Sequence, residues 1–334
     1  MKDFKDKTVV ITGGAGYIGS SLASRLVAGG RSVTILDTLQ NGGESILALR
    51  NFPGFVLRPT DITQSDDLEA ALYGAQCVVH LAALVGFPAC NDAGREVTWE
   101  LNVEGTERVF GAAKSAGVDR FLYASSYSNY GIAEEGQLVT EESPLHPQST
   151  YAESKVAGEE FLLAQNSGPV VTCLRLATVF GISPRTRFDL MVNQFALAAH
   201  LREKLTIYQE DVRRTFIHVS DVARAFECVA DADPRVVKGQ IFNVGHENLN
   251  SSKQEIIELM REMWPDLDVQ FASLEFGGDM RSVHVSFEKI RAALDFIPAF
   301  TLRDGITELH RELTSGCVYP PEDRRYRNHP PLIT

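Results

Sequence analysis

A glycine cluster near the N-terminus constrains this chain more than any other feature. The β-branched run at residues 9–11 stops at a glycine-rich stretch, residues 12–19, and apolar residues with helical spacing follow. This order predicts a strand, a tight turn and a helix. Glycines at 13, 16 and 19 let the backbone bend sharply, and they let a pyrophosphate approach the N-terminus of the helix, where N–H groups and the helix dipole favour an anion.

A carboxylate at the end of the next predicted strand supports a dinucleotide site. Residues 32–37 predict a second strand that ends at Asp37, after Gly19 by eighteen residues. An acid there can accept hydrogen bonds from both hydroxyls of an adenosine ribose and repels a 2′-phosphate, so NAD is favoured over NADP. The alternative is a glycine turn beside a surface Asp, but strand, turn, helix, strand and acid occur here in the required order. The cofactor residues assigned in this part are Gly13, Gly16, Tyr17, Ile18 and Asp37.

The charge and the cysteines exclude several classes of partner. The 334 residues carry a formal net charge of −12, which argues against a nucleic acid or an anionic membrane as the main partner. An anionic small molecule is compatible with this charge, since a few arginines can reverse the field inside a cleft. The five cysteines lack metal-ligand spacing, which predicts free thiols and no metal site. Without a signal peptide or a long apolar run, we expect a cytoplasmic protein.

Strands and helices alternate along the first half of the chain. Further strands are predicted at residues 55–57, 77–81, 120–124 and 170–176, with helices at 68–73, 97–116 and 151–165. This alternation predicts an α/β fold with a Rossmann-type, doubly wound parallel sheet. Beyond residue 181 helices are predicted at 188–201, 251–264, 287–294 and 302–313, and strands at 215–219 and 240–244. We expect a smaller mixed α/β lobe over the carboxyl ends of the strands.

The change of pattern also suggests how the chain divides. A chain of 334 residues exceeds the size at which a single core usually stops growing. We assign residues 1–180 and 212–245 to an NAD-binding domain, 181–211 and 246–316 to a substrate lobe, and 317–334 to a C-terminal tail. The tail is rich in Pro and Arg and either follows the surface or is disordered.

Tyr151 and Lys155 are the strongest candidates for chemistry. Four residues apart on a predicted helix, they share one face, and Ser125 and Ser126 end the fifth predicted strand. A phenol titrates near pH ~10, but an adjacent ammonium and a positively charged nicotinamide both stabilise phenolate. A serine hydroxyl can hold the substrate oxygen while the proton moves. The alternative, a surface Tyr and a solvated Lys, is disfavoured by the dinucleotide motif and the strand-end serines.

Together these motifs resemble extended short-chain dehydrogenase/reductases, and more closely the NAD-dependent epimerase/dehydratase group acting on nucleotide sugars. The resemblance spans nearly the whole chain and rests on residues 12–19, 61–62, 80–83, 102–106, 125–126, 151–155, 216–223 and 242–245. It implies that Asp61 and the Ile62 amide hold the adenine, that Leu81, Ala82 and Ala83 line the dinucleotide, and that Ser125 packs near the cofactor. It further implies that Ser126 is the catalytic hydroxyl, Tyr151 the acid/base, and Lys155 the ligand of the nicotinamide ribose.

The resemblance also points to a diphosphate of the substrate. Arg214 and Arg281 occupy positions at which the family meets that diphosphate, and two guanidiniums suit a pyrophosphate through bidentate, charge-assisted hydrogen bonds. The alternative for each is an ordinary surface arginine. Asp189 falls near a substrate-facing position but stays unassigned. Asn102, His218 and Asp221 carry family motifs and are interpreted as mainly structural.

Departures from the family narrow the reaction. Dehydratases of the family place an Asp-Glu pair after the catalytic hydroxyl, whereas this chain has Tyr127 and Ser128, which disfavours a dehydratase or a decarboxylase. We therefore predict an NAD-dependent epimerase of a nucleotide-diphosphate sugar. The alternatives are a 4-keto-sugar nucleotide reductase and a catalytically silent NAD sensor. A homodimer through helices 97–116 and 151–165 is expected. The loop at 85–90 is expected to border the sugar pocket, with Cys90 as a buried thiol rather than a catalytic one.

Overall fold

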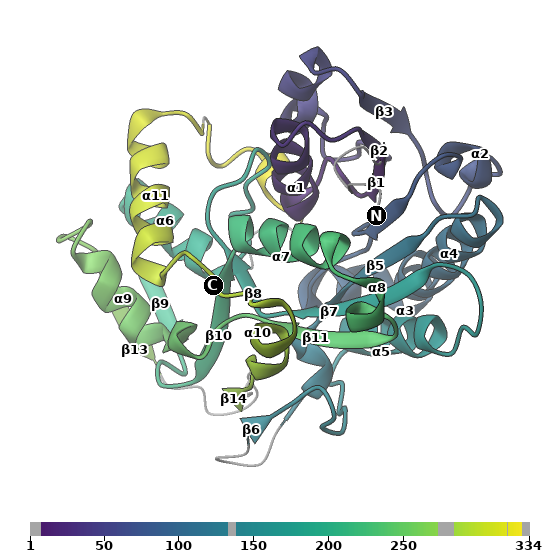
Figure 1. Ribbon diagram of the computed structural model, residues 1–334. Helices are drawn as coiled ribbons and strands as arrows, with labels where there is room; N and C mark the ends of the chain where they lie inside the picture. Colours follow the sequence, from purple (N-terminus) through teal and green to yellow (C-terminus); the bar gives the residue numbers. More distant parts are fainter. Residues whose placement is uncertain (1–7, 133–137, 273–283, 319, 329–334) are drawn as a thin grey trace.

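A seven-stranded parallel sheet runs through the larger part of the molecule (Figure 1). The computed structural model describes residues 8–132, 138–272, 284–318 and 320–328. The strands of the sheet are β1 (Val9–Thr12), β2 (Val33–Asp37), β3 (Phe55–Pro59), β4 (Cys77–His80), β5 (Arg120–Ser126), β7 (Val170–Leu176) and β11 (Gln240–Val244). They lie in the order β11-β7-β5-β4-β1-β2-β3. The sheet confirms the doubly wound fold, and the strand order reverses between β1 and β4, where such sheets bind ligands.

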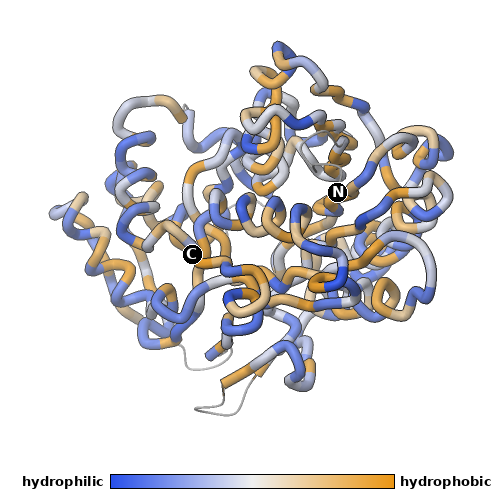
Figure 2. The backbone as a smooth tube through the Cα atoms, viewed as in Figure 1, coloured by the Kyte–Doolittle hydropathy of each residue, from blue (hydrophilic) through white to orange (hydrophobic). Residues whose placement is uncertain are grey.

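Helices cover both faces of this sheet, which explains why its central strands are continuous apolar runs. One face carries α1 (Tyr17–Ala28) and α7 (Val219–Asp231), which share a core that includes Leu22 and Phe226. The other carries α2 (Leu68–Leu72), α4 (Gly105–Ser115) and α5 (Thr150–Leu163), with Phe110 and Leu162 in their common core. Figure 2 shows the hydrophobic residues along the strands between these two layers. No helix of the described residues is long and apolar enough to cross a membrane.

The predicted helix at residues 97–116 is present, but it contains a π-helical turn and a further helical stretch precedes it. The chain is already helical in α3 (Phe87–Trp99), makes a π-helical turn at Glu100–Glu104, and continues as α4. Pro88 in the first turn favours this early start, and Gly94 interrupts the helix with a φ of 84°. The predicted loop at 85–90 is therefore helical from its third residue. The π-helical turn matters for function, since its residues Glu100 and Leu101 line the cavity described below.

The second half of the chain builds the smaller lobe that was predicted. Its strands are β8 (Thr178–Phe180), β10 (Arg213–His218) and β12 (Asn250–Ser252) in one sheet, and β9 (Leu205–Tyr208) beside β13 (Val269–Ala272). A further pair, β6 (Leu138–Val139) beside β14 (His284–Val285), packs against the core of the main sheet. The helices of the smaller lobe are α6 (Met191–Leu201), α9 (Lys253–Arg261) and α11 (Leu302–Ser315). The helix α10 (Glu288–Leu294) packs against the core of the main sheet, and a short α8 (Pro234–Val237) precedes β11. The helices α6, α9 and α11 share a core of their own.

The core of the smaller lobe includes residues of the tail and of the range assigned to the NAD-binding domain. Val318 joins the core of the smaller lobe and Tyr326 packs against it, so the described part of the tail follows the surface. That core also takes Phe180 and Phe216, which lie in the ranges assigned to the NAD-binding domain. The division of the chain into two domains stays a prediction.

A buried ion pair joins the sheet to α5. Arg175 on β7 and Glu159 on α5 are each 2% exposed, and their Nη2 and Oε2 atoms lie 2.6 Å apart. The Nη1 of Arg175 also donates to the Tyr130 hydroxyl at 3.0 Å. Because α5 carries Tyr151 and Lys155, these bonds fix the helix that presents both side chains.

We expect Arg175→Met to lower the free energy of unfolding by about 3–5 kcal/mol, because it leaves the Glu159 carboxylate buried without its partner. Urea titration followed by circular dichroism measures this. The matched control is Arg213→Met, whose pair with Glu255 is exposed and should contribute less than about 1 kcal/mol. Equal losses in the two variants would show that the buried pair does not hold α5.

Candidate active site

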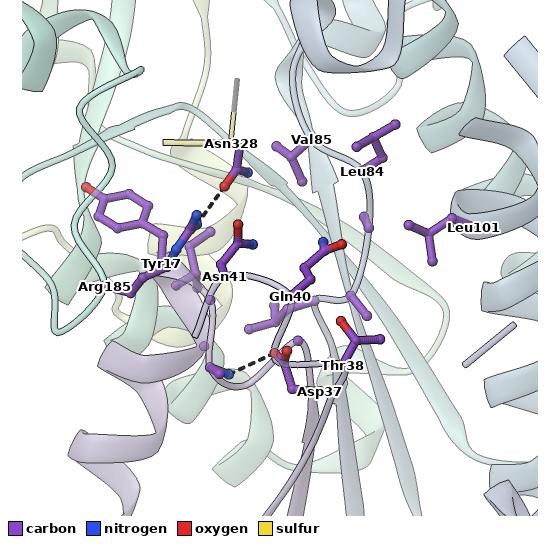
Figure 3. Close-up of a pocket in the computed structure, with 18 of the residues that line it drawn as sticks. Tyr17, Asp37, Thr38, Gln40, Asn41, Leu84, Val85, Leu101, Arg185 and Asn328 are labelled. Atoms are coloured by element: carbon purple, nitrogen blue, oxygen red, sulfur yellow. Dashed lines mark hydrogen bonds between the residues drawn. The ribbon is translucent and has the colours of Figure 1, made fainter. Parts of the chain in front are cut away.

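A cavity of about 1210 Å³ follows the carboxyl ends of β1, β2, β4 and β5. Figure 3 shows part of its lining, with Asp37, Thr38 and Gln40 from the end of β2 and Tyr17 from the start of α1. The residues predicted to bind the cofactor that line this cavity are Gly13, Gly16, Tyr17, Ile18, Asp37, Asp61, Ile62, Leu81, Ala82, Ala83, Ser125, Tyr151 and Lys155. The fold thus brings the whole predicted cofactor set into one cavity.

The glycine-rich turn forms the floor of the cavity. Gly13 has a φ of 69°, and a Cβ built there would lie 2.8 Å from the Ala82 amide nitrogen. A Cβ at Gly19 would press on the Gly13 carbonyl oxygen. α1 then begins at Tyr17 without a side-chain cap, so its N-terminal dipole is available to an anion. Only glycine gives the backbone this close approach, which suits a pyrophosphate.

Two carboxylates line the cavity, Asp37 at the end of β2 and Asp61 just after β3. Asp37 accepts hydrogen bonds from the Ala15 amide at 3.0 Å and the Leu39 amide at 2.8 Å, which hold the carboxylate at the tip of β2. Asp61 accepts from the Thr63 amide at 2.9 Å. The backbone therefore orients both acids beside the cavity, as a ribose and an adenine ring require.

A buried threonine holds the wall formed by the end of β4. The Thr12 Oγ1 accepts hydrogen bonds from the Leu81 and Ala82 amides, each at 3.2 Å. Its hydroxyl also lies 2.7 Å from the His80 Nδ1. Burial lowers the pKa of His80 to about 3, so this imidazole is neutral and serves packing rather than proton transfer.

Tyr151 lines the cavity, whereas Ser126 at the end of β5 does not. Their side chains share a hydrogen bond, and burial raises the pKa of Tyr151 to about 12. The Ser126 bond and the positive charge of Arg187 act in the opposite direction and lower that pKa. Without its cofactor the protein therefore holds Tyr151 as a phenol at neutral pH. The positive charge of an oxidised nicotinamide would favour the phenolate.

Lys155, expected to bind the nicotinamide ribose, is hydrogen-bonded to the backbone in this structure. It lines the cavity on the same helix as Tyr151, but its ammonium donates to the Ala124 carbonyl at 2.9 Å. Burial lowers the pKa of Lys155 to about 8. Its position at the end of β5 suits a hydrogen bond to the nicotinamide ribose, the function that the family resemblance implies.

Several cavity residues were missed in the sequence analysis, and two of them are buried arginines. Arg185 and Arg187 are 5% and 8% exposed, line the cavity and follow the turn after β8. The Arg187 Nη2 lies 2.6 Å from the Asp189 Oδ2, so the previously unassigned Asp189 is the partner of an arginine. Burial raises the pKa of Asp189, but Arg187 outweighs it and holds that pKa below its usual value. The basic composition of residues 183–187 was the available signal.

The predicted substrate arginines are not brought together within the described structure. Arg214 lies on β10 opposite Ser251 of β12 and does not line the cavity. Arg281 lies outside the described residues. Cys90 is 1% exposed on α3, and burial raises its pKa, which disfavours the thiolate that a nucleophile requires.

The family-motif residues interpreted as structural make contacts of that kind. Asn102 binds both the amide and the carbonyl of Leu84, at 2.7 and 3.0 Å. His218 lies 2.8 Å from the Glu308 carboxylate. Asp221 accepts hydrogen bonds from backbone amides of the segment before α11. They fix a cavity wall and the junction with the smaller lobe.

The fold and the cavity define a Rossmann-type enzyme that binds a dinucleotide, and comparison with known proteins gives its family. The family model "NAD dependent epimerase/dehydratase family" matches residues 9–245. A dTDP-glucose 4,6-dehydratase of Streptomyces griseus is 30% identical over 309 residues, covering 89% of this chain and 91% of that protein. The chain therefore belongs to the NAD-dependent epimerase/dehydratase family, and its cofactor is NAD.

Two further similarities cover almost the same length. A UDP-glucose 4-epimerase of Mycolicibacterium smegmatis is 29% identical over 308 residues, covering 90% of this chain and 96% of that protein. The solved structure of MoeE5 in complex with UDP-glucuronic acid and NAD superposes with a TM-score of 0.80 at 28% identity, covering 93% of this chain and 99% of the other. Relatives with different reactions are thus similar to this chain to the same degree.

The charge of Arg187 gives a pH prediction. Arg187 lowers the pKa of Tyr151, so Arg187→Gln should raise it and move the rising limb of the pH–rate profile to higher pH, by up to about one unit. The measurement is kcat against pH. Arg235→Gln, which removes an arginine whose side chain is 89% exposed, should leave the limb in place. A limb that does not move in Arg187→Gln would show that this arginine does not act on Tyr151.

Proposed function

We propose that the protein is an NAD-dependent epimerase of a nucleotide-diphosphate sugar. The observation that carries the proposal is the surroundings of Tyr151. Its hydroxyl is hydrogen-bonded to Ser126, and the next two residues are Tyr127 and Ser128, where dehydratases of the family have an acidic pair. The Tyr127 hydroxyl is itself engaged with Thr178 at 2.7 Å. Elimination of water needs an acid at the leaving hydroxyl, so proton transfer by Tyr151 suits epimerisation better.

The bound NAD would accept a hydride from the sugar carbon and return it. As the hydride leaves, Tyr151 takes the proton of the hydroxyl on that same carbon, and Ser126 holds the hydroxyl oxygen. The keto sugar then rotates in the site and presents its opposite face to the cofactor. The hydride returns to that face, and Tyr151 gives the proton back. Asp37, the glycine-rich turn and Lys155 keep the cofactor in place during the cycle.

The substrate class rests on the relatives. A UDP-glucose 4-epimerase and a protein solved with UDP-glucuronic acid and NAD match almost the whole chain. We propose a nucleotide-diphosphate sugar for this chain as well, with Arg214 and Arg281 at its diphosphate and Ser126 at the sugar. A 4-keto-sugar nucleotide reductase would use the same proton relay, and the experiment below separates it from an epimerase. A silent NAD sensor is disfavoured, because it would not need that relay.

We also propose a homodimer, formed through α3, α4 and α5. Phe87 at the start of α3 is 58% exposed, and a contact at this face would cover its apolar ring. The five cysteines are free, which agrees with the proposed cytoplasmic location. Sedimentation at micromolar concentration tests the dimer, and a monomer would refute it.

Cofactor content and turnover, measured together, test the epimerase. The purified protein is denatured to quantify NAD⁺ and NADH, and the native protein is incubated with UDP-, dTDP-, GDP- and CDP-sugars without added cofactor. We expect near-stoichiometric NAD⁺ and interconversion of sugars without net NADH change. An empty protein that consumes NADH one-for-one with a keto-sugar nucleotide would instead be a reductase.

Tyr151→Phe tests the proton relay. Removing the hydroxyl should lower turnover by about 10²- to 10⁴-fold, the usual contribution of a positioned acid/base, while NAD stays bound. Turnover and retained NAD are measured on the same preparation. The matched control is Tyr73→Phe, at a tyrosine that is 85% exposed. Full activity in Tyr151→Phe would remove Tyr151 from the mechanism.

A further inference from the structure

The C-terminal segment 320–328 forms one wall of the cofactor cavity. Four of its side chains, those of Glu322, Arg324, Arg327 and Asn328, line the same cavity as the glycine-rich turn. Figure 3 shows Asn328 and Arg185 joined above this turn, close to Tyr17 and Asn41. A segment at the end of the chain therefore faces the site that the beginning of the chain builds.

Arg185 ties this segment to the rest of the molecule. Its guanidinium is 5% exposed and donates to the Arg325 carbonyl at 3.1 Å, the Arg327 carbonyl at 3.2 Å and the Asn328 Oδ1 at 2.6 Å. One planar side chain thus satisfies three acceptors of a single irregular segment, a geometry that arginine provides and lysine does not.

Further contacts hold the segment itself and connect Arg185 to α1. The Phe188 amide donates to the Tyr326 carbonyl at 2.8 Å, and the two rings pack edge to face with centroids 5.9 Å apart. The Ser183 hydroxyl donates to the Tyr17 carbonyl at 2.7 Å and accepts from the Arg185 amide at 3.2 Å. The segment is therefore connected through a short series of bonds to the first turn of α1.

The cavity has several positively charged side chains, although the net charge of the chain is negative. Arg185, Arg187, Arg324 and Arg327 line the cavity, although the chain has a net charge of −12. Burial, and then repulsion from Arg187, lowers the pKa of Arg185 to about 10, so Arg185 stays charged at neutral pH. Cations gathered at one wall of a cavity gain stability when an anion binds beside them.

We propose that residues 320–328 are a clasp for NAD: Arg324 and Arg327 supply positive charge to the pyrophosphate from the side opposite the glycine-rich turn, and Arg185 holds the clasp closed. The cofactor then leaves only when the clasp detaches. The inference uses the NAD site alone and does not depend on the epimerase reaction. It gives the C-terminal segment a binding function.

The test measures how fast the cofactor leaves. Protein loaded with NADH is mixed with excess ADP-ribose, and the loss of NADH fluorescence gives the dissociation rate. Arg324→Gln/Arg327→Gln should raise this rate by about 10- to 100-fold, the effect of losing hydrogen bonds to a charged group, and should weaken its dependence on salt. Affinity for adenosine, which lacks phosphate, should not change.

Matched variants keep the result interpretable. Arg235→Gln removes an exposed arginine and should leave the dissociation rate unchanged. Arg185→Lys keeps the charge but not the three-acceptor geometry, and should also accelerate dissociation; its melting temperature shows that it is folded. Wild-type dissociation rates in both Arg324→Gln/Arg327→Gln and Arg185→Lys would overturn the clasp. If NADH dissociates faster from the variants but the wild type does not interconvert sugars, the epimerase is refuted and the clasp is still supported.

Discussion

The close packing of backbone on backbone at the glycine-rich turn is the constraint on which the rest of the structure depends. Gly13 lies so near the Ala82 amide, and Gly19 so near the Gly13 carbonyl, that no side chain fits at either position. This packing draws the start of α1 against the ends of β1 and β4. The helix dipole, the tip of β2 and the β4 wall then face one cavity, and the dinucleotide site follows from the geometry of a single turn.

The chemistry depends on a second element, α5, whose position is set by buried charge. Glu159 accepts from Arg175 on the sheet and also from the Asn129 side chain at 3.1 Å, which in turn donates to the Ser125 hydroxyl at 3.1 Å. One carboxylate thus connects the strand that ends in the serines with the helix that carries Tyr151. Because a partly satisfied buried network is costly, strand and helix can shift only together, and the proton relay keeps its geometry.

The cofactor half of the site could be predicted because its signals are local. Strand, glycine turn, helix and acid follow each other within the first forty residues, and the strand and helix periods are regular. The helical stretch that starts at Phe87 was missed because Gly94 separates it from the regular pattern of residues 97–116.

The four arginines that line the cavity, Arg185, Arg187, Arg324 and Arg327, could not be predicted, because their contacts are not local in sequence. Arg185 meets residues about 140 positions later in the chain, in a tail without periodicity. Arg187 and Asp189 are neighbours in sequence, but only the fold brings Arg187 near Tyr151. Sequence gives no measure of which distant segments share a cavity.

The clasp bears differently on the two reactions that this site can support. An epimerase returns the hydride to the same sugar, so its cofactor need not leave, and slow release costs nothing in turnover. A reductase must release oxidised cofactor and bind reduced cofactor in every cycle, so detachment of residues 320–328 would limit its rate. If the cofactor is held between the glycine-rich turn and the cavity arginines, slow release would limit a reductase but not an epimerase. The C-terminal segment bears on the choice between an epimerase and a reductase, whereas Tyr127 and Ser128 after Ser126 bear on the choice between an epimerase and a dehydratase.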